Sequence, residues 1–282
     1  NMITIDAHQH FWNPSRGDYF WMPENDKILS RTYTVDDLEN EFKKTKVNNT
    51  VLIQAAPSNA ETEYMLGIAD SSKIISGVVG WINFENPNQI KQLKKFLNHK
   101  KFVGVRPMIQ DIPDVNWMLR KDLDWAFEAL IDMNLTFDAL GFPKHLDNFF
   151  KIAEKYPSLK IVIDHFMKPK ICNNDPKEFE VWKLGMKKLS EFKNVYCKFS
   201  GIVTEACKDW KESDLKPYAE HIFNIFGSEK IMWGSDWPVC RLRSEYNKWF
   251  ITAKNLSNKL SVKENEDIFG KTAIKFYNLN ID

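Results

Sequence analysis

Short apolar runs alternate along this chain with longer segments of helical periodicity. In the first run, Ile3, Ile5 and Ala7 alternate with polar residues, which is the pattern of a strand with one buried face. Similar runs recur with helical patterns between them. They predict eight strands, at residues 3–7, 50–53, 75–81, 102–106, 135–139, 161–164, 195–199 and 231–235.

The segments between the apolar runs carry the signals that begin helices. Thr34 precedes the helical pattern of residues 35–38, Ser58 precedes that of 60–63, and Asn86-Pro87 opens a Lys-rich segment. Ser, Thr and Asn side chains cap the free N–H groups of a first helical turn, and Pro suits its first position. Further helices are predicted at residues 125–133, 145–156, 179–192, 215–226 and 246–256. A last helix, at about 262–277, is expected to pack on the outside.

Eight alternations of strand and helix within 282 residues predict a (β/α)8 TIM barrel. The alternative is a doubly wound open sheet, which would favour a nucleotide-binding loop after the first strand. The segment from Asp6 to Trp12 lacks the glycines that let a backbone approach phosphate, so the barrel is preferred. No repeat or Ser/Gly-rich linker divides the chain, and one domain is expected to span residues 2–282.

Composition narrows the class of protein. With 43% hydrophobic residues, 27% charged residues and a net charge of +1, the chain can bury a large core and has no basic stripe for nucleic acid. No apolar stretch approaches the roughly 18 residues of a membrane span, so no membrane partner and a cytoplasmic location are expected. The four cysteines show no Cys-x-x-Cys spacing and are expected to be reduced thiols; they are Cys172, Cys197, Cys207 and Cys240. The sequence does not indicate an oligomeric state.

Polar or aromatic side chains stand at the predicted end of every strand. Active sites of (β/α)8 barrels are built at these ends, which makes the side chains candidate site residues. In chain order they are His8, His10, Gln54, Trp81, Arg106, Asp138, Asp164, His165, Lys198, Ser200 and Asp236. Carboxylates, imidazoles and cations are the groups that hydrolysis needs to activate water, polarise a carbonyl and stabilise an oxyanion. Ser235 lacks the Gly-x-Ser-x-Gly turn, so no covalent acyl-enzyme is expected.

The pair of His8 and His10 has two interpretations. Residues two apart on a strand point the same way, so both imidazoles can converge on one metal ion or on one substrate carbonyl. Together with Asp236 they could hold a single zinc ion and its water.

With these residues in view, the chain resembles the amidohydrolase superfamily, and within it the group of sugar lactonases that act on L-rhamnono- and L-fuconolactone. The segments that carry the resemblance are Asp6-Ala7-His8-Gln9-His10-Phe11-Trp12, Gln54-Ala55-Ala56-Pro57, Gly80-Trp81, Gly104-Val105-Arg106, Asp164-His165, Lys168-Pro169, Lys198-Phe199-Ser200-Gly201 and Trp233-Gly234-Ser235-Asp236-Trp237-Pro238. The resemblance runs nearly end to end. It implies a hydrolase that opens a sugar lactone to an aldonic acid.

The resemblance also implies roles for the candidate residues. Asp236 would be the general base on the attacking water, and His8, His10 and His165 would polarise the lactone carbonyl, directly or through a metal. The expected substrate contacts are Arg106, Lys198, Gln54, Trp81, Asp138 and Trp237. Relatives with two metals use a carboxylated lysine at the fourth strand, where this chain has Arg106-Pro107, so a two-metal centre is not expected. The expectation is that no cofactor is required, with one zinc on His8, His10 and Asp236 as the alternative.

Three other functions stay open. A metal-dependent decarboxylase of the same superfamily would share the two histidines of the first strand and the final aspartate. A lactonase for a pyrone dicarboxylate would need several arginines to grip two carboxylates, and Arg106 is the only arginine at a central strand end. A non-catalytic binding barrel would release no acid from any lactone.

Overall fold

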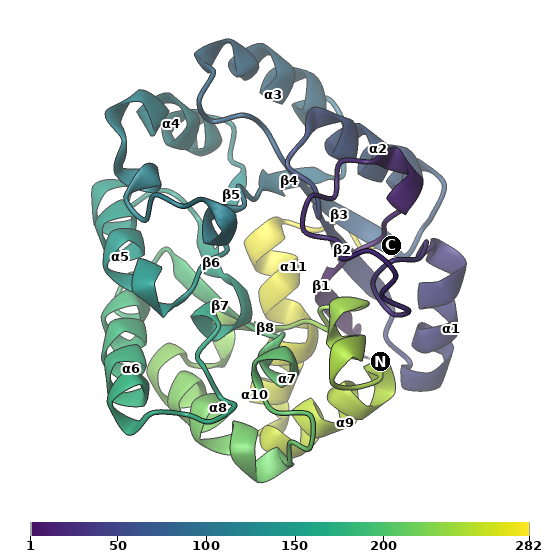
Figure 1. Cartoon of the computed structure of the whole chain (residues 1–282), viewed down its shortest axis with the longest axis vertical. Coiled ribbons are helices and arrows are strands. Elements are labelled where there is room, and N and C mark those ends of the chain that lie inside the picture. The colour runs from purple at the N-terminus through teal and green to yellow at the C-terminus, as the bar shows by residue number, and fades with distance from the viewer. Residues whose placement is uncertain (1, 282) are drawn as a thin grey trace.

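The computed structural model describes residues 2–281, so Asp282, the end of the expected domain, lies outside the described residues. Eight parallel strands follow one another in chain order around a barrel, and helices form the outer ring (Figure 1). The strands are β1 Ile5–Gln9, β2 Asn49–Ile53, β3 Ile75–Gly80, β4 Phe102–Val105, β5 Thr136–Ala139, β6 Ile161–Ile163, β7 Val195–Phe199 and β8 Ile231–Trp233. The predicted TIM barrel is confirmed, and the predicted strand ends differ from these by at most two residues. The domain boundaries stay a prediction.

The helices begin where the capping signals placed them. The Ser58 hydroxyl accepts a hydrogen bond from the Glu61 N–H at 3.0 Å, and the Thr34 N–H donates to the Asp37 carboxylate at 2.9 Å. The helices are α1 Val35–Thr45, α2 Asn59–Asp70, α3 Ile90–Leu97, α4 Asp124–Asp132, α5 Leu146–Lys155, α6 Pro176–Ser190, α7 Ile202–Glu205, α8 Glu212–Phe226, α9 Tyr246–Leu256, α10 Val262–Glu266 and α11 Thr272–Tyr277. The short helix α7 had no sequence signal, and α6 begins three residues before its predicted start.

The barrel closes through the residues that follow β8. The Asp236 N–H donates to the His8 carbonyl at 2.8 Å, and the His10 N–H donates to the Trp237 carbonyl at 2.8 Å. We call this pair of hydrogen bonds the closing seam. The same two segments carry four of the predicted site residues, His8, His10, Asp236 and Trp237, so the seam fixes their relative positions.

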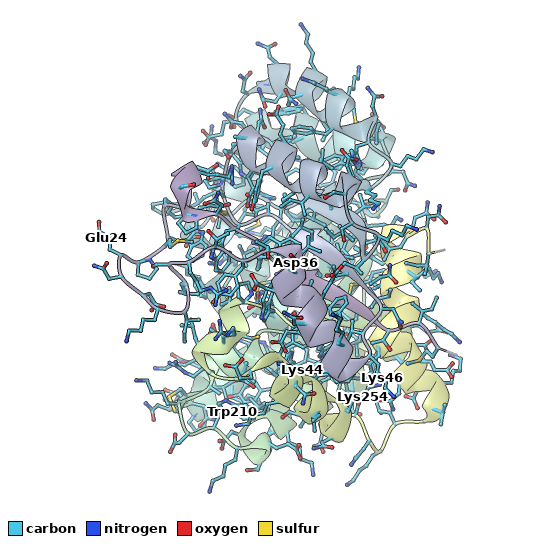
Figure 2. All side chains as sticks on the ribbon, turned by 90° about the vertical axis from the view of Figure 1, so that its right-hand side faces the viewer. Glu24, Asp36, Lys44, Lys46, Trp210 and Lys254 are labelled. Carbon is cyan, nitrogen blue, oxygen red and sulfur yellow. A yellow bond between two sulfur atoms is a disulfide. The ribbon has the colours of Figure 1, made fainter. Side chains whose placement is uncertain are left out.

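The C-terminal helix corrects one prediction. We expected it to pack on the outside, but Phe276 and Tyr277 at the end of α11 pack against the interior side chains of the strands, including Ile5 and Val162. In Figure 2, the C-terminal helices, coloured yellow, lie on the side of the barrel opposite the protruding loop that bears Glu24. The expectation was wrong because helical periodicity shows that a helix has an apolar face and does not show which surface covers it. Here that surface is the open lower end of the barrel.

A disulfide corrects a second expectation. Cys172 and Cys207 are bonded, with their Cα atoms 4.6 Å apart, and they join the loop before α6 to the segment after α7. The two cysteines are 35 positions apart in the sequence, so no local pattern showed that they lie close together. Cys197 and Cys240 are free and buried. No helix in the described part of the chain is long and apolar enough to cross a membrane.

Candidate active site

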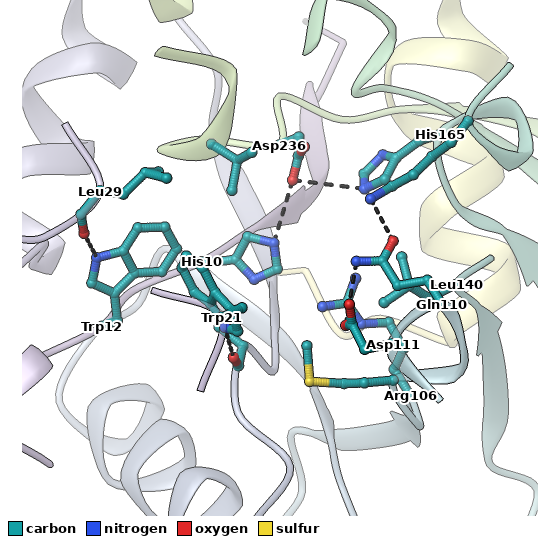
Figure 3. Close-up of a pocket in the computed structure, with 14 residues that line it drawn as sticks. His10, Trp12, Trp21, Leu29, Arg106, Gln110, Asp111, Leu140, His165 and Asp236 are labelled. Carbon is teal, nitrogen blue, oxygen red and sulfur yellow. Dashed lines mark hydrogen bonds and ion pairs between the residues drawn. The ribbon is translucent and has the colours of Figure 1, made fainter. Parts of the chain in front are cut away.

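Three imidazoles surround the Asp236 carboxylate at the end of the barrel where the strands finish. The distances to Asp236 Oδ1 are 3.3 Å from His10 Nε2, 3.6 Å from His8 Nε2 and 3.7 Å from His165 Nε2. Figure 3 shows His10 and His165 on either side of Asp236. His8 lies in β1 and His10 directly after it, His165 follows β6, and Asp236 follows β8. The sequence predicted that these four residues belong to one site, and the structure brings them together.

Unusual backbone conformations present two of these side chains. Asp236 has a φ of +54°, and the four residues from His165 to Lys168 all have φ between +51° and +62°. Such left-handed conformations cost about 1–2 kcal/mol for each residue that bears a Cβ. The turn from His165 to Lys168 directs both side chains at its ends into the pocket described below.

The position of His165 depends on its neighbour Gly201. A Cβ added to Gly201 would lie 2.5 Å from His165 Cγ, and Gly201 has a φ of +67°. The preceding residue, Ser200, places its hydroxyl 2.8 Å from His165 Nδ1. Only glycine therefore lets the chain after β7 approach this imidazole closely enough for that contact.

The carboxylate of Asp6 fastens the two sides of the closing seam. It accepts hydrogen bonds from the Ser235 N–H at 2.8 Å, the Tyr246 hydroxyl at 2.9 Å and the His8 N–H at 3.1 Å. Asp6 is fully buried, so these three donors compensate for the loss of water around its charge. The arrangement holds β1 against the residues that lead to Asp236.

Burial and nearby charges set the protonation of the site. Burial, together with Lys198, holds the pKa of His8 well below its usual 6.5, and burial lowers the pKa of His165 to about 4. Burial alone would raise the pKa of Asp236, but His165 and His10 outweigh it and lower that pKa to about 2. At neutral pH, His8 and His165 are therefore neutral imidazoles beside an ionised carboxylate.

Hydrogen bonds to the far side of each ring determine which nitrogen carries the hydrogen. His10 Nδ1 lies 2.8 Å from the Ile53 carbonyl and must donate to it, so in the neutral form of the ring the lone pair is on Nε2, which faces Asp236. His8 Nδ1 lies 3.0 Å from Lys198 Nζ, and an ammonium group has only donors. His8 Nδ1 therefore accepts, and Nε2 carries the hydrogen.

A cavity of about 170 Å³ opens beside Asp236. Its polar lining is His10, Arg106, Gln110, Asp111, His165, Lys168 and Asp236, and its apolar lining is Trp12, Trp21, Leu29, Ala55, Met108, Leu140 and Val239 (Figure 3). No binding role was predicted for Gln110, Asp111 or Lys168, because they lie in loops with no periodicity to mark them. The signal for Lys168 was its place in the Lys168-Pro169 segment that carries the family resemblance, three residues after His165.

Arg106 is the predicted substrate contact that lines this cavity. Its Nε donates to Gln54 Oε1 at 2.7 Å, one terminal nitrogen donates to the Gln54 carbonyl at 2.7 Å, and the other donates to Asp164 Oδ2 at 3.0 Å. Three of its five N–H groups are thereby used, and two remain for a ligand. Gln54 thus orients Arg106 from below the cavity.

The other predicted substrate contacts lie elsewhere. Asp138 and Lys198 are fully buried and pair with each other at 2.7 Å beneath the cavity. Trp81 lines a separate cavity together with Pro57 and Trp117. Trp237 is buried in an aromatic cluster with Phe11 and Tyr33. Their predicted role in substrate binding stays a prediction.

Two groups of side chains have donor atoms close enough to hold one metal ion. The first is His8, His10 and Asp236, and the second is His8, Asp164 and His165. The second group is a poor site for a cation, because Arg106 and Lys198 lie 3.0 and 3.6 Å from the oxygens of Asp164. The first group is the one that the sequence predicted.

The sequence and the fold of this chain are similar to those of known proteins. The profile of a family described as amidohydrolase matches residues 5–279. The chain is 34% identical over 282 residues to the L-fucono-1,5-lactonase of Burkholderia ambifaria, with 99% of this chain and 96% of that protein covered. It is 29% identical to the L-fucono-1,5-lactonase of Burkholderia multivorans, with coverages of 98% and 96%. A crystal structure of an amidohydrolase from Burkholderia multivorans with bound zinc has a TM-score of 0.93 at 28% identity and covers 99% of this chain and all of that one.

Proposed function

The chain belongs to the amidohydrolase family and is a hydrolase of lactone esters, and on this premise we propose that it opens an L-fucono-1,5-lactone-like sugar lactone to the aldonic acid by attack of a water that Asp236 activates. The observation that carries the proposal is the ionised Asp236 carboxylate at the wall of a 170 Å³ cavity, with three imidazole nitrogens around it. The cavity has the mixture of polar and aromatic lining that suits the hydroxyls and the apolar face of a sugar ring.

The attacking water fits between two acceptors. In the neutral form of His10, the lone pair of Nε2 and the oxygen Asp236 Oδ1 face each other at 3.3 Å with no hydrogen of their own to share. A water molecule that donates one hydrogen to each of them satisfies both, and it directs its lone pairs toward the cavity. As this water attacks the carbonyl carbon, Asp236 accepts its proton.

The remaining groups stabilise the oxyanion and hold the ring. With the Ser200 hydroxyl, 2.8 Å away, as the donor to His165 Nδ1, His165 Nε2–H is free to donate to the carbonyl oxygen as negative charge develops there. The two free N–H groups of Arg106 and the ammonium of Lys168 bind the ring hydroxyls and the product carboxylate. When the C–O bond of the lactone breaks, Asp236 returns its proton to the ring oxygen, which leaves as a hydroxyl. His8 is fully buried behind Asp236 and orients that carboxylate.

The described residues do not fit a three-ligand zinc centre. Bound zinc would act as a Lewis acid and would lower the pKa of its water. Zinc binds imidazole through a lone pair, which His10 offers at Nε2, but His8 Nε2 carries a hydrogen while Lys198 donates to Nδ1. We therefore derive no step through a metal, and the expectation that no cofactor is required stays a prediction.

A panel of sugar lactones tests the proposed function. We expect acid release, followed with a pH indicator, from at least one L-sugar 1,5-lactone and no turnover of a pyrone dicarboxylate. Asp236→Asn keeps the shape of the side chain and should reduce kcat by roughly 100- to 10,000-fold with an unchanged circular dichroism spectrum. Wild-type turnover in Asp236→Asn would contradict the role of the base, and the absence of acid release from every lactone would contradict the substrate class.

The cytoplasmic location expected from the sequence stays a prediction. The disulfide between Cys172 and Cys207 is an observation against it, because disulfides persist in oxidising compartments. Fractionation of the native cell followed by detection of the protein would settle the compartment.

A further inference from the structure

A chain of buried polar side chains runs through the barrel from the C-terminal helix to the active site. The Tyr277 hydroxyl lies 2.9 and 3.0 Å from the two oxygens of Asp138. Asp138 Oδ2 accepts from Lys198 Nζ at 2.7 Å, and Lys198 Nζ lies 3.0 Å from His8 Nδ1. His8 Nε2, on the far side of the ring, faces Asp236 Oδ1 at 3.6 Å.

Each contact in this chain is needed to compensate for burial. Asp138, Lys198 and His8 are fully buried, and Tyr277 is 2% exposed. Apolar strand side chains of the barrel interior pack in one cluster with Tyr277, among them Ala7 and Met232. A buried charge is stable only when it is paired and hydrogen-bonded, so the two donors to Asp138 act together to keep it a carboxylate that holds Lys198.

Two carboxylates, those of Asp138 and Asp164, attract the ammonium group of Lys198. Lys198 Nζ lies 2.7 Å from Asp138 but also 3.6 Å from Asp164 Oδ1, an oxygen that makes no hydrogen bond to a described residue. A weaker hold by Asp138 would let the ammonium move toward Asp164 and would change its contact with His8. Through Asp138, the hydroxyl of Tyr277 therefore affects where Lys198 lies relative to His8.

We propose that Tyr277 is a positioning residue for catalysis, which acts through Asp138 and Lys198 to keep the hydrogen of His8 on Nε2, facing Asp236. The C-terminal helix thereby closes the barrel and also specifies which nitrogen of His8 carries the hydrogen. The kinetic part of this inference rests on the proposed lactone hydrolysis, and the part that concerns His8 does not.

The test compares Tyr277→Phe with Phe276→Leu in the full-length protein labelled with ¹⁵N-histidine. Tyr277→Phe removes only the hydroxyl. Phe276→Leu changes the packing of the same apolar cluster at the lower end of the barrel and removes no hydrogen bond of a side chain. Imidazole nitrogen chemical shifts distinguish a nitrogen that carries a hydrogen from one that does not, and a His8→Asn sample assigns the His8 signals. We expect Tyr277→Phe to shift both His8 nitrogen signals and to lower kcat roughly 10- to 100-fold with KM within twofold. Phe276→Leu should do neither.

Three outcomes would overturn the inference. They are unchanged His8 signals in Tyr277→Phe, an equal shift in Phe276→Leu, or shifted signals with an unchanged kcat on a lactone that the wild type hydrolyses. If the wild type hydrolyses no lactone while the His8 signals shift as expected, the proposed function fails and the relay to His8 stands. If Tyr277→Phe does not fold, Asp138→Asn should shift the same signals, because a neutral amide holds Lys198 less firmly.

Discussion

Replacement of Gly201 by alanine tests whether the rate of hydrolysis depends on the position of the His165 imidazole. Two costs follow from the structure. A Cβ at a φ of +67° costs about 1–2 kcal/mol of folding stability. The new atom would also lie 2.5 Å from His165 Cγ, so the imidazole must retreat by about 0.9 Å to reach ordinary van der Waals contact. That movement would separate His165 from the Ser200 hydroxyl, which now lies 2.8 Å from it.

We expect Gly201→Ala to lower kcat by roughly 100-fold, because a displacement of about 1 Å in a catalytic group has an effect of this size. The matched control is Gly17→Ala, whose glycine has a φ of +80° and no atom within 4 Å of the added Cβ. Both variants should lose about 1–2 kcal/mol in urea unfolding, but only Gly201→Ala should lose turnover in the indicator assay. Wild-type kcat in Gly201→Ala, or an equal loss in both variants, would refute the assignment of His165 to the carbonyl.

Three further predictions address the cavity, the metal and the pH dependence of stability. Lys168→Met should raise KM about tenfold or more with kcat nearly unchanged, because a hydrogen bond from a charged donor contributes about 1.5–3 kcal/mol; an unchanged KM would argue against this contact. Dialysis against dipicolinate should leave turnover intact, and complete loss with recovery on addition of zinc would show that a metal is needed. Burial raises the pKa of Glu61 from 4.5 to about 7, so folded-state stability should fall by up to about 3 kcal/mol as pH rises from 4.5 through 7. Glu61→Gln should remove that decline in urea unfolding, and equal slopes in both proteins would count against it.

The sequence predicted the fold well because every barrel strand is an apolar run between helical segments. Residues 195–199 form a strand with the same bounds as predicted. The C-terminal helix was misplaced because its apolar residues fit two surfaces equally well, the outside of the ring and the open end of the barrel. The disulfide between Cys172 and Cys207 was missed because it depends on how two loops meet, which no local pattern records.

The site was predicted in part. Strand-end positions located Asp236, the three histidines and Arg106, since parallel strands all finish at one face. Alternation shows that a side chain points into the barrel but gives no depth, so Asp138 and Lys198, each one residue before the end of its strand, lie one layer below the cavity. Lys168 and Gln110 reach the cavity from loops, and the 2.5 Å contact between their polar atoms has no counterpart in the sequence pattern.

The closing seam also constrains the order in which this protein gains its activity during folding. His8 and Ser235, on its two sides, are 227 residues apart in the chain. Bringing segments so distant together costs on the order of 5 kcal/mol in loop entropy, and contacts of this range form late. Helices and most strand pairs can be complete while His10 and Asp236 are still apart. Recovery of turnover during refolding should therefore lag behind recovery of secondary structure. The rate at which activity returns then reports the rate of the last step of barrel assembly.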